Sequence, residues 1–310
     1  VISINRILNK KDKEVVSFIG ILSDKHETKN GNFILQFEDL TGKIKVIVSK
    51  NDRELLELCK DLMFDEVLGI KGSLSKDIIF ARNIIYPDLP LTKELKKSPD
   101  EVYAICTSDL HVGSTYFYKE NFLRFVDWLN GNIGEEKQAE IAKKVKYLFL
   151  CGDLIAGIGV YPKQDEELII KDIYEQYKEL AELLGKIRKD IFIIACPGNH
   201  DAVRMSEPQP LLNREFAKPL YEIQNIIFVN NPGWINIHSS ENFEGFNFLL
   251  YHGFSFYYYA NNVESIRKNG GSARGDLIKK YLLQRRHLAP SHTSTLYFPD
   301  SRFDPLVIDI

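Results

Sequence analysis

Hydrophobic and polar residues alternate with a period of two through much of the first 86 residues, which predicts short β-strands. Asn30-Gly31 and Thr41-Gly42 supply turns. Leucines at 55, 56, 58 and 62 indicate a helix over 52–62. The expected strands cover 14–23, 32–40, 43–49, 66–75 and 77–86. Five strands with a helix between the third and fourth predict an OB-fold barrel over residues 1–88.

The pattern changes after a segment rich in proline and lysine, 89–100, which we expect to be a linker. Apolar runs ending in "CTSD", "LCGD" and "CPGNHD" then alternate with amphipathic stretches such as "KENFLRFVDWLN" and residues 168–188. This alternation predicts a second, α/β domain over 101–310, with functional loops after the strand ends. The final run, "PLVIDI", has the composition of a strand.

Composition narrows the class of protein. The chain has 310 residues, of which 44% are hydrophobic and 27% charged, and this excludes collagen-like and disordered classes. No apolar run approaches the roughly 18 residues of a membrane span, and no signal peptide opens the chain. We therefore expect a soluble, cytoplasmic protein without a membrane partner. Because the chain starts at Val1 and stops inside an apolar run, we also expect it to be a trimmed piece of a longer protein.

Charge and cysteine content refine this expectation. The net charge of −3 argues against binding nucleic acid through bulk charge, but it leaves room for a local groove. Four scattered cysteines without a CxxC pair form neither a disulfide framework nor a zinc motif. Cys106, Cys151 and Cys196 each end an apolar run, so we expect buried fillers in three neighbouring strands.

Polar motifs with metal-ligand residue types follow these runs and one more. In "SDLHVGS", alternation along an extended segment lets a carboxylate and an imidazole reach the same cation. The mixture of Asp, His and Asn across the motifs suits Mn²⁺, Fe²⁺ or Zn²⁺, and a central carboxylate can bridge two ions. The candidates are Asp109 and His111 in the first motif, Asp153 in "CGDLIAG", Asn199, His200 and Asp201 in "CPGNHDAV", and His252 in "LLYHGFS".

In this order, the four motifs resemble those of the calcineurin-like metallophosphoesterases over residues 101–310. The resemblance implies a four-layer α/β sandwich with a binuclear metal site on the strand-end loops. It implies that His200 contacts the phosphate and aids the leaving group, and that Asp201 orients the His200 ring through a hydrogen bond. One metal would be held by Asp109, His111 and Asp153, and the other by Asp153, Asn199 and His252.

The whole chain resembles the small subunits of archaeal family D DNA polymerases. The resemblance rests on the barrel upstream of the phosphoesterase motifs and on four segments: "YPKQ" at 161–164, "GNHDAVR" at 198–204, "EPQP" at 207–210 and "RRHLAP" at 285–290. That resemblance implies a proofreading 3′→5′ exonuclease with two divalent ions, Mn²⁺ in first place and Fe²⁺ or Zn²⁺ as alternatives. It implies a large catalytic subunit and a single-stranded or mispaired 3′ DNA end as partners, with a sliding clamp as a further candidate. The cellular location would be the archaeal cytoplasm, at the nucleoid during replication.

One departure from the family concerns a Gly-His-x-His segment that supplies a further ligand to each metal. This sequence has no such segment, and after His252 its histidines are His287 and His292. We expect the segment to lie beyond Ile310. The alternative is that His287 and His292 take its place.

Residues near the motifs are candidates for contact with DNA. Arg204 is a candidate for a DNA phosphate, against a solvated or ion-paired arginine. Three consecutive tyrosines after His252 cannot all face inward, so at least one should be exposed, and Tyr257 is a candidate for stacking on a base. The barrel itself could either bind single-stranded DNA or serve as a docking module for another protein.

Two other functions stay open at this point. A stand-alone metallophosphoesterase acting on nucleotides, RNA or phosphoproteins is disfavoured by the linked barrel. A non-catalytic polymerase B-subunit scaffold is disfavoured because the expected ligands are all present.

Overall fold

A computed structural model describes residues 1–90, 94–300 and 302–309, and the chain divides into two compact units. The first unit comprises Val1–Lys93 together with Gly253–Ile310, and the second comprises Glu94–His252. This division differs from the predicted domains, since residues 253–310 pack with the barrel segment. Part of the predicted linker, 91–93, lies outside the described residues.

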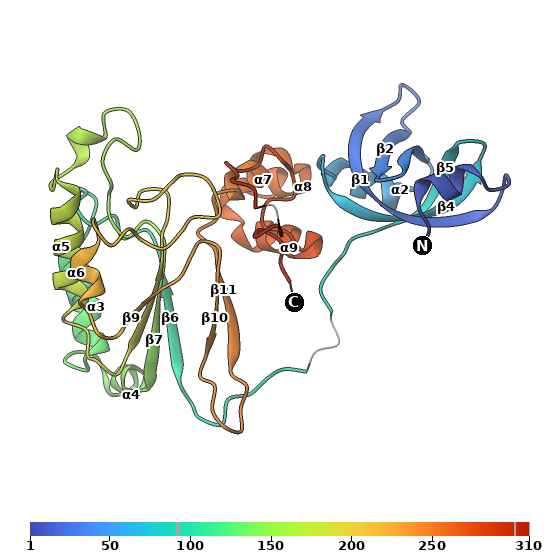
Figure 1. Cartoon of the computed structure of the whole chain (residues 1–310). Coiled ribbons are helices and arrows are strands. Elements are labelled where there is room, and N and C mark those ends of the chain that lie inside the picture. The colour runs from blue at the N-terminus through green and yellow to red at the C-terminus, as the bar shows by residue number, and fades with distance from the viewer. Residues whose placement is uncertain (91–93, 301, 310) are drawn as a thin grey trace. The chain divides into compact units, whose positions relative to one another are not determined.

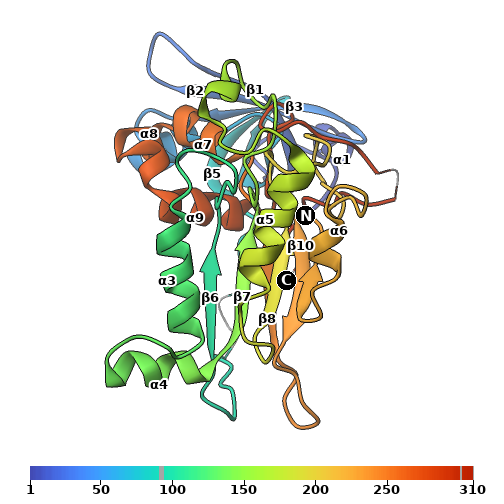
Figure 2. The same cartoon turned by 90° about the vertical axis from the view of Figure 1, so that its left-hand side faces the viewer.

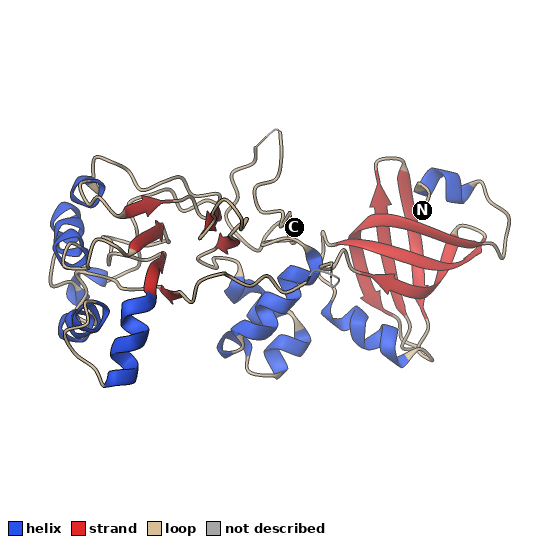
Figure 3. Cartoon of the chain, turned by 90° about the horizontal axis from the view of Figure 1, so that it is seen from below, coloured by secondary structure: helices blue, strands red, loops and turns tan. Residues whose placement is uncertain are grey.

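The first unit contains a closed five-stranded barrel (Figures 1 and 3). Burial alternates along its strands, as a barrel with one packed face requires; on β2, for example, Phe33, Leu35 and Phe37 are buried. The strands are β1 (Val15–Glu27), β2 (Phe33–Asp39), β3 (Gly42–Val48), β4 (Val67–Ser75) and β5 (Ile78–Ile85), in the order β1-β2-β3-β5-β4. Helix α2 (Arg53–Asp61) follows β3, so the five strands and the helix expected from the sequence are confirmed as elements. Helix α1 (Ile4–Leu8), which the pattern did not indicate, buries Ile4 and Ile7.

Three helices near the carboxyl end of the chain complete this unit. They are α7 (Phe256–Asn262), α8 (Glu264–Lys268) and α9 (Gly275–Arg285), with a 3₁₀ turn (Gly271–Ala273) before α9. Arg285 of α9 forms a buried ion pair with Glu66, directly before β4, and this pair is one of the contacts between the segment and the barrel. The strand expected at 305–310 is wrong, because Val307 makes only an isolated bridge to His287 among the described residues there.

A parallel four-stranded sheet forms the centre of the second unit. Its order is β6 (Tyr103–Thr107), β7 (Val145–Cys151), β8 (Phe192–Cys196) and β9 (Ile226–Phe228). The three cysteine-bearing strands are therefore neighbours, as predicted, and Cys151 lies opposite Cys196 in the register of β7 and β8. Cys106 is exposed rather than buried, because β6 is an edge strand.

Helices cover one face of this sheet and a two-stranded sheet covers the other (Figures 1 and 2). The helices are α3 (Lys119–Leu129), α5 (Ile173–Leu184) and α6 (Lys218–Tyr221); α4 (Glu136–Lys144) and a 3₁₀ turn (Gln164–Glu167) lie in connections. Strands β10 (Gly233–Ile237) and β11 (Phe246–Leu250) form the second sheet, which packs through Ile237 and Leu250 on Phe149 and Ile194. The described part of 94–252 thus has three layers, and the four-layer sandwich expected over 101–310 stays a prediction. No helix in the described residues is long and apolar enough to cross a bilayer.

Candidate metal centre

Two strand-end loops run side by side and carry the first three candidate ligands. The N–H of Asp109, after β6, donates to the Gly152 carbonyl at 3.0 Å, and the N–H of His111 donates to the Asp153 carbonyl at 3.0 Å. Asp109, His111 and Asp153 have φ values of 56°, 50° and 51°, a left-handed conformation that is uncommon for residues other than glycine. Such strained residues cluster at functional sites, and here they bring two strand ends to one place.

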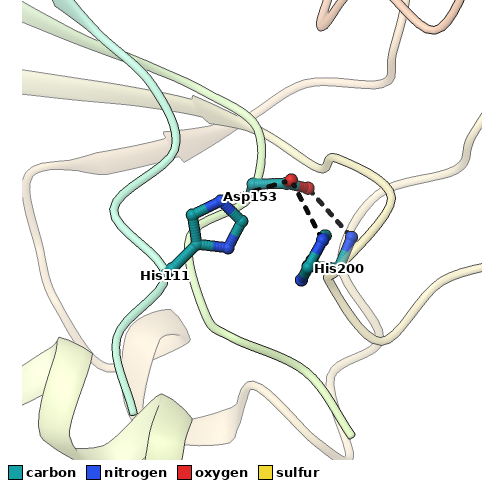
Figure 4. A group of neighbouring side chains, drawn as sticks. All are labelled: His111, Asp153 and His200. Carbon is teal, nitrogen blue, oxygen red and sulfur yellow. Dashed lines mark hydrogen bonds and ion pairs between the residues drawn. The ribbon is translucent and has the colours of Figure 1, made fainter. Parts of the chain in front are cut away.

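Asp153 lies at the centre of this place, with a side chain that is only 5% exposed. Its Oδ2 is 3.7 Å from His111 Nε2 and 3.8 Å from His200 Nε2, and its Oδ1 is 3.4 Å from His252 Nε2 (Figure 4 shows His111 and His200 on either side). The backbone N–H of His200 also donates to Asp153 Oδ1 at 2.9 Å. Residues from three other motifs therefore converge on the carboxylate of Asp153.

The ring orientations of two histidines favour metal binding. His252 Nδ1 donates to the Cys151 carbonyl at 2.9 Å, and His200 Nδ1 donates to the Ala156 carbonyl at 2.7 Å. A carbonyl oxygen only accepts hydrogen bonds, so in each ring Nδ1 carries the proton and Nε2 faces Asp153. Histidines that ligate metals are held in this way by a partner on the other ring nitrogen.

The charges of the site suit the binding of a cation. Burial lowers the pKa of His111 and so favours the neutral ring, which is the form that binds metals. Burial would also lower the pKa of His252, but hydrogen bonding and charge from Asp153 raise it to about 9. For Asp153 itself, burial would raise the pKa, yet His252 and His200 hold it below its ordinary value. The anionic carboxylate thus has a proton on His252 as its partner, and a metal ion would replace that proton.

The donor set fits divalent metals, and its potential ligand atoms form two groups that share one carboxylate. Potential ligand atoms of His111, Asp153 and His200 lie within 4.8 Å of one another, as do those of Asp109, Asp153 and His252. Asp109 Oδ1 is also 3.9 Å from His111 Nε2. The remaining candidate, Asn199, places its Oδ1 at 3.0 Å from His252 Nε2. Asp153 is common to both groups, which is the arrangement that a bridging carboxylate requires.

The predicted hydrogen bond between Asp201 and the His200 ring is wrong. The Asp201 carboxylate is 4% exposed and accepts from the N–H groups of Gly198 at 2.8 Å and Leu154 at 3.2 Å. Burial raises its pKa to about 7, although these backbone donors oppose the shift. The Ala156 carbonyl orients His200 instead. Asp201 therefore holds two strand-end loops together and supports the site through the backbone.

The other predicted residues have contacts or exposure of their own. The Arg204 guanidinium donates to the Pro208 carbonyl within its own loop. Tyr257 is 72% exposed on α7 of the first unit, which confirms that at least one of the three tyrosines is exposed. His287 and His292 also belong to the first unit, where the His287 ring is 3.0 Å from Asp304. The contacts of Arg204 and Tyr257 with DNA stay predictions.

Two buried glutamines that are not among the predicted site residues support the site. Gln164 donates to the Ala156 carbonyl at 2.7 Å, the same oxygen that orients His200, and accepts from the Val160 N–H. Gln176 of α5 exchanges two hydrogen bonds with the backbone of Gly157. The "YPKQ" motif was the available signal for Gln164. For Gln176 the sequence offered none, since its partner is a backbone group.

Glycine at position 152 is needed for space as well as for conformation. Its φ is +83°, and a Cβ there would overlap the His252 ring. We expect Gly152→Ala to displace His252 and to weaken Mn²⁺ binding at least about 10- to 100-fold, measured by isothermal titration calorimetry. Gly159→Ala is the matched control, because its φ is +71° but no atom lies within 4 Å of the added carbon. Equal metal affinity in the two variants would contradict this role of Gly152.

The chain is similar to known proteins over both units. Residues 104–307 match the family model for calcineurin-like phosphoesterases. The chain is 41% identical over 297 residues to the DNA polymerase II small subunit of Methanothermobacter thermautotrophicus, covering 96% of this chain and 59% of that protein. It is 38% identical over 311 residues to the protein of the same name from Pyrococcus furiosus, covering 100% of this chain and 49% of that protein.

A third relative, the DNA polymerase II small subunit of Methanocaldococcus jannaschii, is 39% identical over 305 residues, with 98% of this chain and 49% of that protein covered. The chain thus spans about half the length of the curated relatives it matches. Its family is decided by the phosphoesterase model, which covers most of the chain. The chain belongs to the calcineurin-like phosphoesterase family.

Proposed function

We propose that this chain is the metal-dependent 3′→5′ exonuclease part of the small subunit of an archaeal family D DNA polymerase. The observation that carries the proposal is the convergence of His111, His200 and His252 on the buried Asp153. The names of the relatives, all DNA polymerase II small subunits, support the subunit assignment. We further propose that the five-stranded barrel is an OB fold that binds DNA or the large subunit.

Two divalent ions would be held by Asp109, His111, Asp153, Asn199 and His252, with Asp153 shared. Such a pair supplies a bound water of lowered pKa and offsets the charge on the phosphoryl oxygens. Mn²⁺ is our first choice of metal, because mixed carboxylate, amide and imidazole donors suit it.

The chain's own residues position the substrate and move a proton. Because His200 Nδ1 donates to the Ala156 carbonyl, its Nε2 is the atom that would face the phosphate. In the imidazolium form, with a proton on both nitrogens, Nε2 can donate to a phosphoryl oxygen or protonate the departing 3′ oxygen. Asp201 and Gln164 keep this ring in place, the first through the Gly198 backbone and the second through Ala156. Arg204, on the same loop, is proposed to contact a DNA phosphate.

The test is digestion of 3′-mispaired and single-stranded DNA by the full-length protein with Mn²⁺. We expect shortening from the 3′ end, and a loss of at least about 100-fold in His200→Ala and Asn199→Ala. Glu140→Ala is the control, because Glu140 is exposed on α4 and belongs to none of the motifs. If the protein leaves DNA intact but hydrolyses bis(p-nitrophenyl) phosphate, a stand-alone phosphodiesterase is favoured. No hydrolysis of either by metal-loaded protein that still captures the large polymerase subunit would favour a scaffold.

A further inference from the structure

A pocket of about 250 Å³ lies beside the candidate metal centre. Asp109, His111 and His200 form one side of it, and Tyr116 and Tyr161 are part of its remaining wall. Sites that enclose drug-sized ligands measure roughly 300–1,000 Å³, so this pocket suits a single planar ring system better than a whole strand segment.

The two tyrosines expose their rings although each lies next to a buried site. Tyr116 is 67% exposed and Tyr161 is 41% exposed. The Tyr161 ring centroid is 6.1 Å from that of His200, with an angle of 59° between the rings. Exposed aromatic faces beside a phosphate-binding centre are what an unpaired nucleobase needs, since every base can stack on such a face.

The loops that carry the tyrosines are held together. The Tyr161 hydroxyl donates to the Glu167 carboxylate at 2.5 Å, and the N–H of Thr115, next to Tyr116, donates to the Glu167 carbonyl at 2.8 Å. Ser114 forms a β-bridge with Leu168. The Tyr161 ring and the backbone beside Tyr116 are therefore both held by Glu167, which reduces the entropy lost on binding.

We propose that Tyr116 and Tyr161 form a stacking subsite for the unpaired base of a nucleotide that flanks the scissile phosphodiester. This inference rests on the proposed exonuclease function and names the part of the substrate that the pocket binds. A base held in a duplex cannot enter the pocket without leaving its stack, so the subsite favours single-stranded and mispaired ends.

The binding test uses an oligonucleotide with 2-aminopurine at the 3′ end, or at the penultimate position, in buffer with Ca²⁺ in place of Mn²⁺. Stacking quenches 2-aminopurine fluorescence. We expect the wild-type chain to quench one of the two probes, and Tyr116→Leu/Tyr161→Leu to lose the quenching and bind about 5- to 150-fold more weakly. Tyr118→Leu is the matched control, because Tyr118 is 75% exposed and lies outside the pocket lining.

Tyr161→Phe separates the ring from its hydroxyl. The phenylalanine keeps the stacking face and loses only the bond to Glu167, so we expect it to quench nearly as the wild type does. If it behaves like the leucine variant, or if the double variant quenches and binds like the wild type, the subsite is refuted. Digestion of DNA in Mn²⁺ distinguishes the two proposals. Full-length wild-type protein that leaves DNA intact overturns the exonuclease function, whereas normal digestion with unchanged KM by the double variant overturns only the subsite.

Discussion

Replacing Asp153 by asparagine should remove metal-dependent hydrolysis of DNA while leaving the fold in place. The asparagine has nearly the same volume, and its single carbonyl oxygen can still accept the His200 N–H that now donates to Oδ1. What it lacks is the negative charge that faces three imidazole Nε2 atoms within 3.8 Å. Because both potential ligand groups contain Asp153, its loss affects both ions. Metal ions contribute several kcal/mol to such reactions, so the rate should fall at least about 10³-fold.

Metal binding gives a second measurement of the same variant. A ligand at 100 times its Kd stabilises a protein by about 2.7 kcal/mol, so Mn²⁺ should raise the melting temperature of the wild type and leave that of Asp153→Asn nearly unchanged. Asp165→Asn, an exposed aspartate in the neighbouring 3₁₀ turn, serves as the control and should respond to Mn²⁺ as the wild type does. A variant at position 153 that binds two equivalents of Mn²⁺ with normal affinity would refute the shared-ligand arrangement.

The composition of the site could be read from the sequence because its geometry follows from parallel strands. Asp109, Asp153 and Asn199 each come shortly after an apolar run, and the carboxyl ends of β6, β7 and β8 meet at one edge of the sheet. Because these strands are neighbours, motifs that are far apart in the sequence form one site. The partner of His200 could not be read in this way. Asp201 is its neighbour in sequence, but the buried backbone N–H groups of Gly198 and Leu154 require an acceptor, and Asp201 meets that need.

The boundary of the compact units escaped prediction for a related reason. The strands of the barrel were legible because alternation is a local signal. Nothing local indicates that Glu66, at the start of one of them, is buried against Arg285 near the other end of the chain. Arg285 is the first residue of the "RRHLAP" motif. That motif supported the resemblance to the polymerase subunits, but it suggested no structural role for the arginine.

Removing the charge of Arg285 should produce the largest loss of stability in the first unit. Glu66 is fully buried, the Arg285 side chain is 3% exposed, and Arg285 Nε lies 3.1 Å from Glu66 Oε1. The guanidinium carbon is also 4.3 Å from the ring centroid of Tyr86 and 3.3 Å from that of Tyr281, whose hydroxyl donates to Glu66. In Arg285→Met the carboxylate would stay buried without its cation, and breaking such a pair costs about 3–5 kcal/mol of unfolding free energy.

The companion variants decide whether desolvated charge is the cause. Glu66→Gln/Arg285→Met removes both charges, so it should be less destabilised than the sum of the single variants. Lys268→Met, which breaks the exposed pair with Glu264, should cost only about 0.3–0.5 kcal/mol. Both tryptophans, Trp128 and Trp234, lie in the second unit, so urea unfolding followed by far-UV circular dichroism and by tryptophan fluorescence separates the two units. If Arg285→Met costs no more than Lys268→Met, the ion pair does not hold residues 253–310 to the barrel, and packing of α7 to α9 must do so instead.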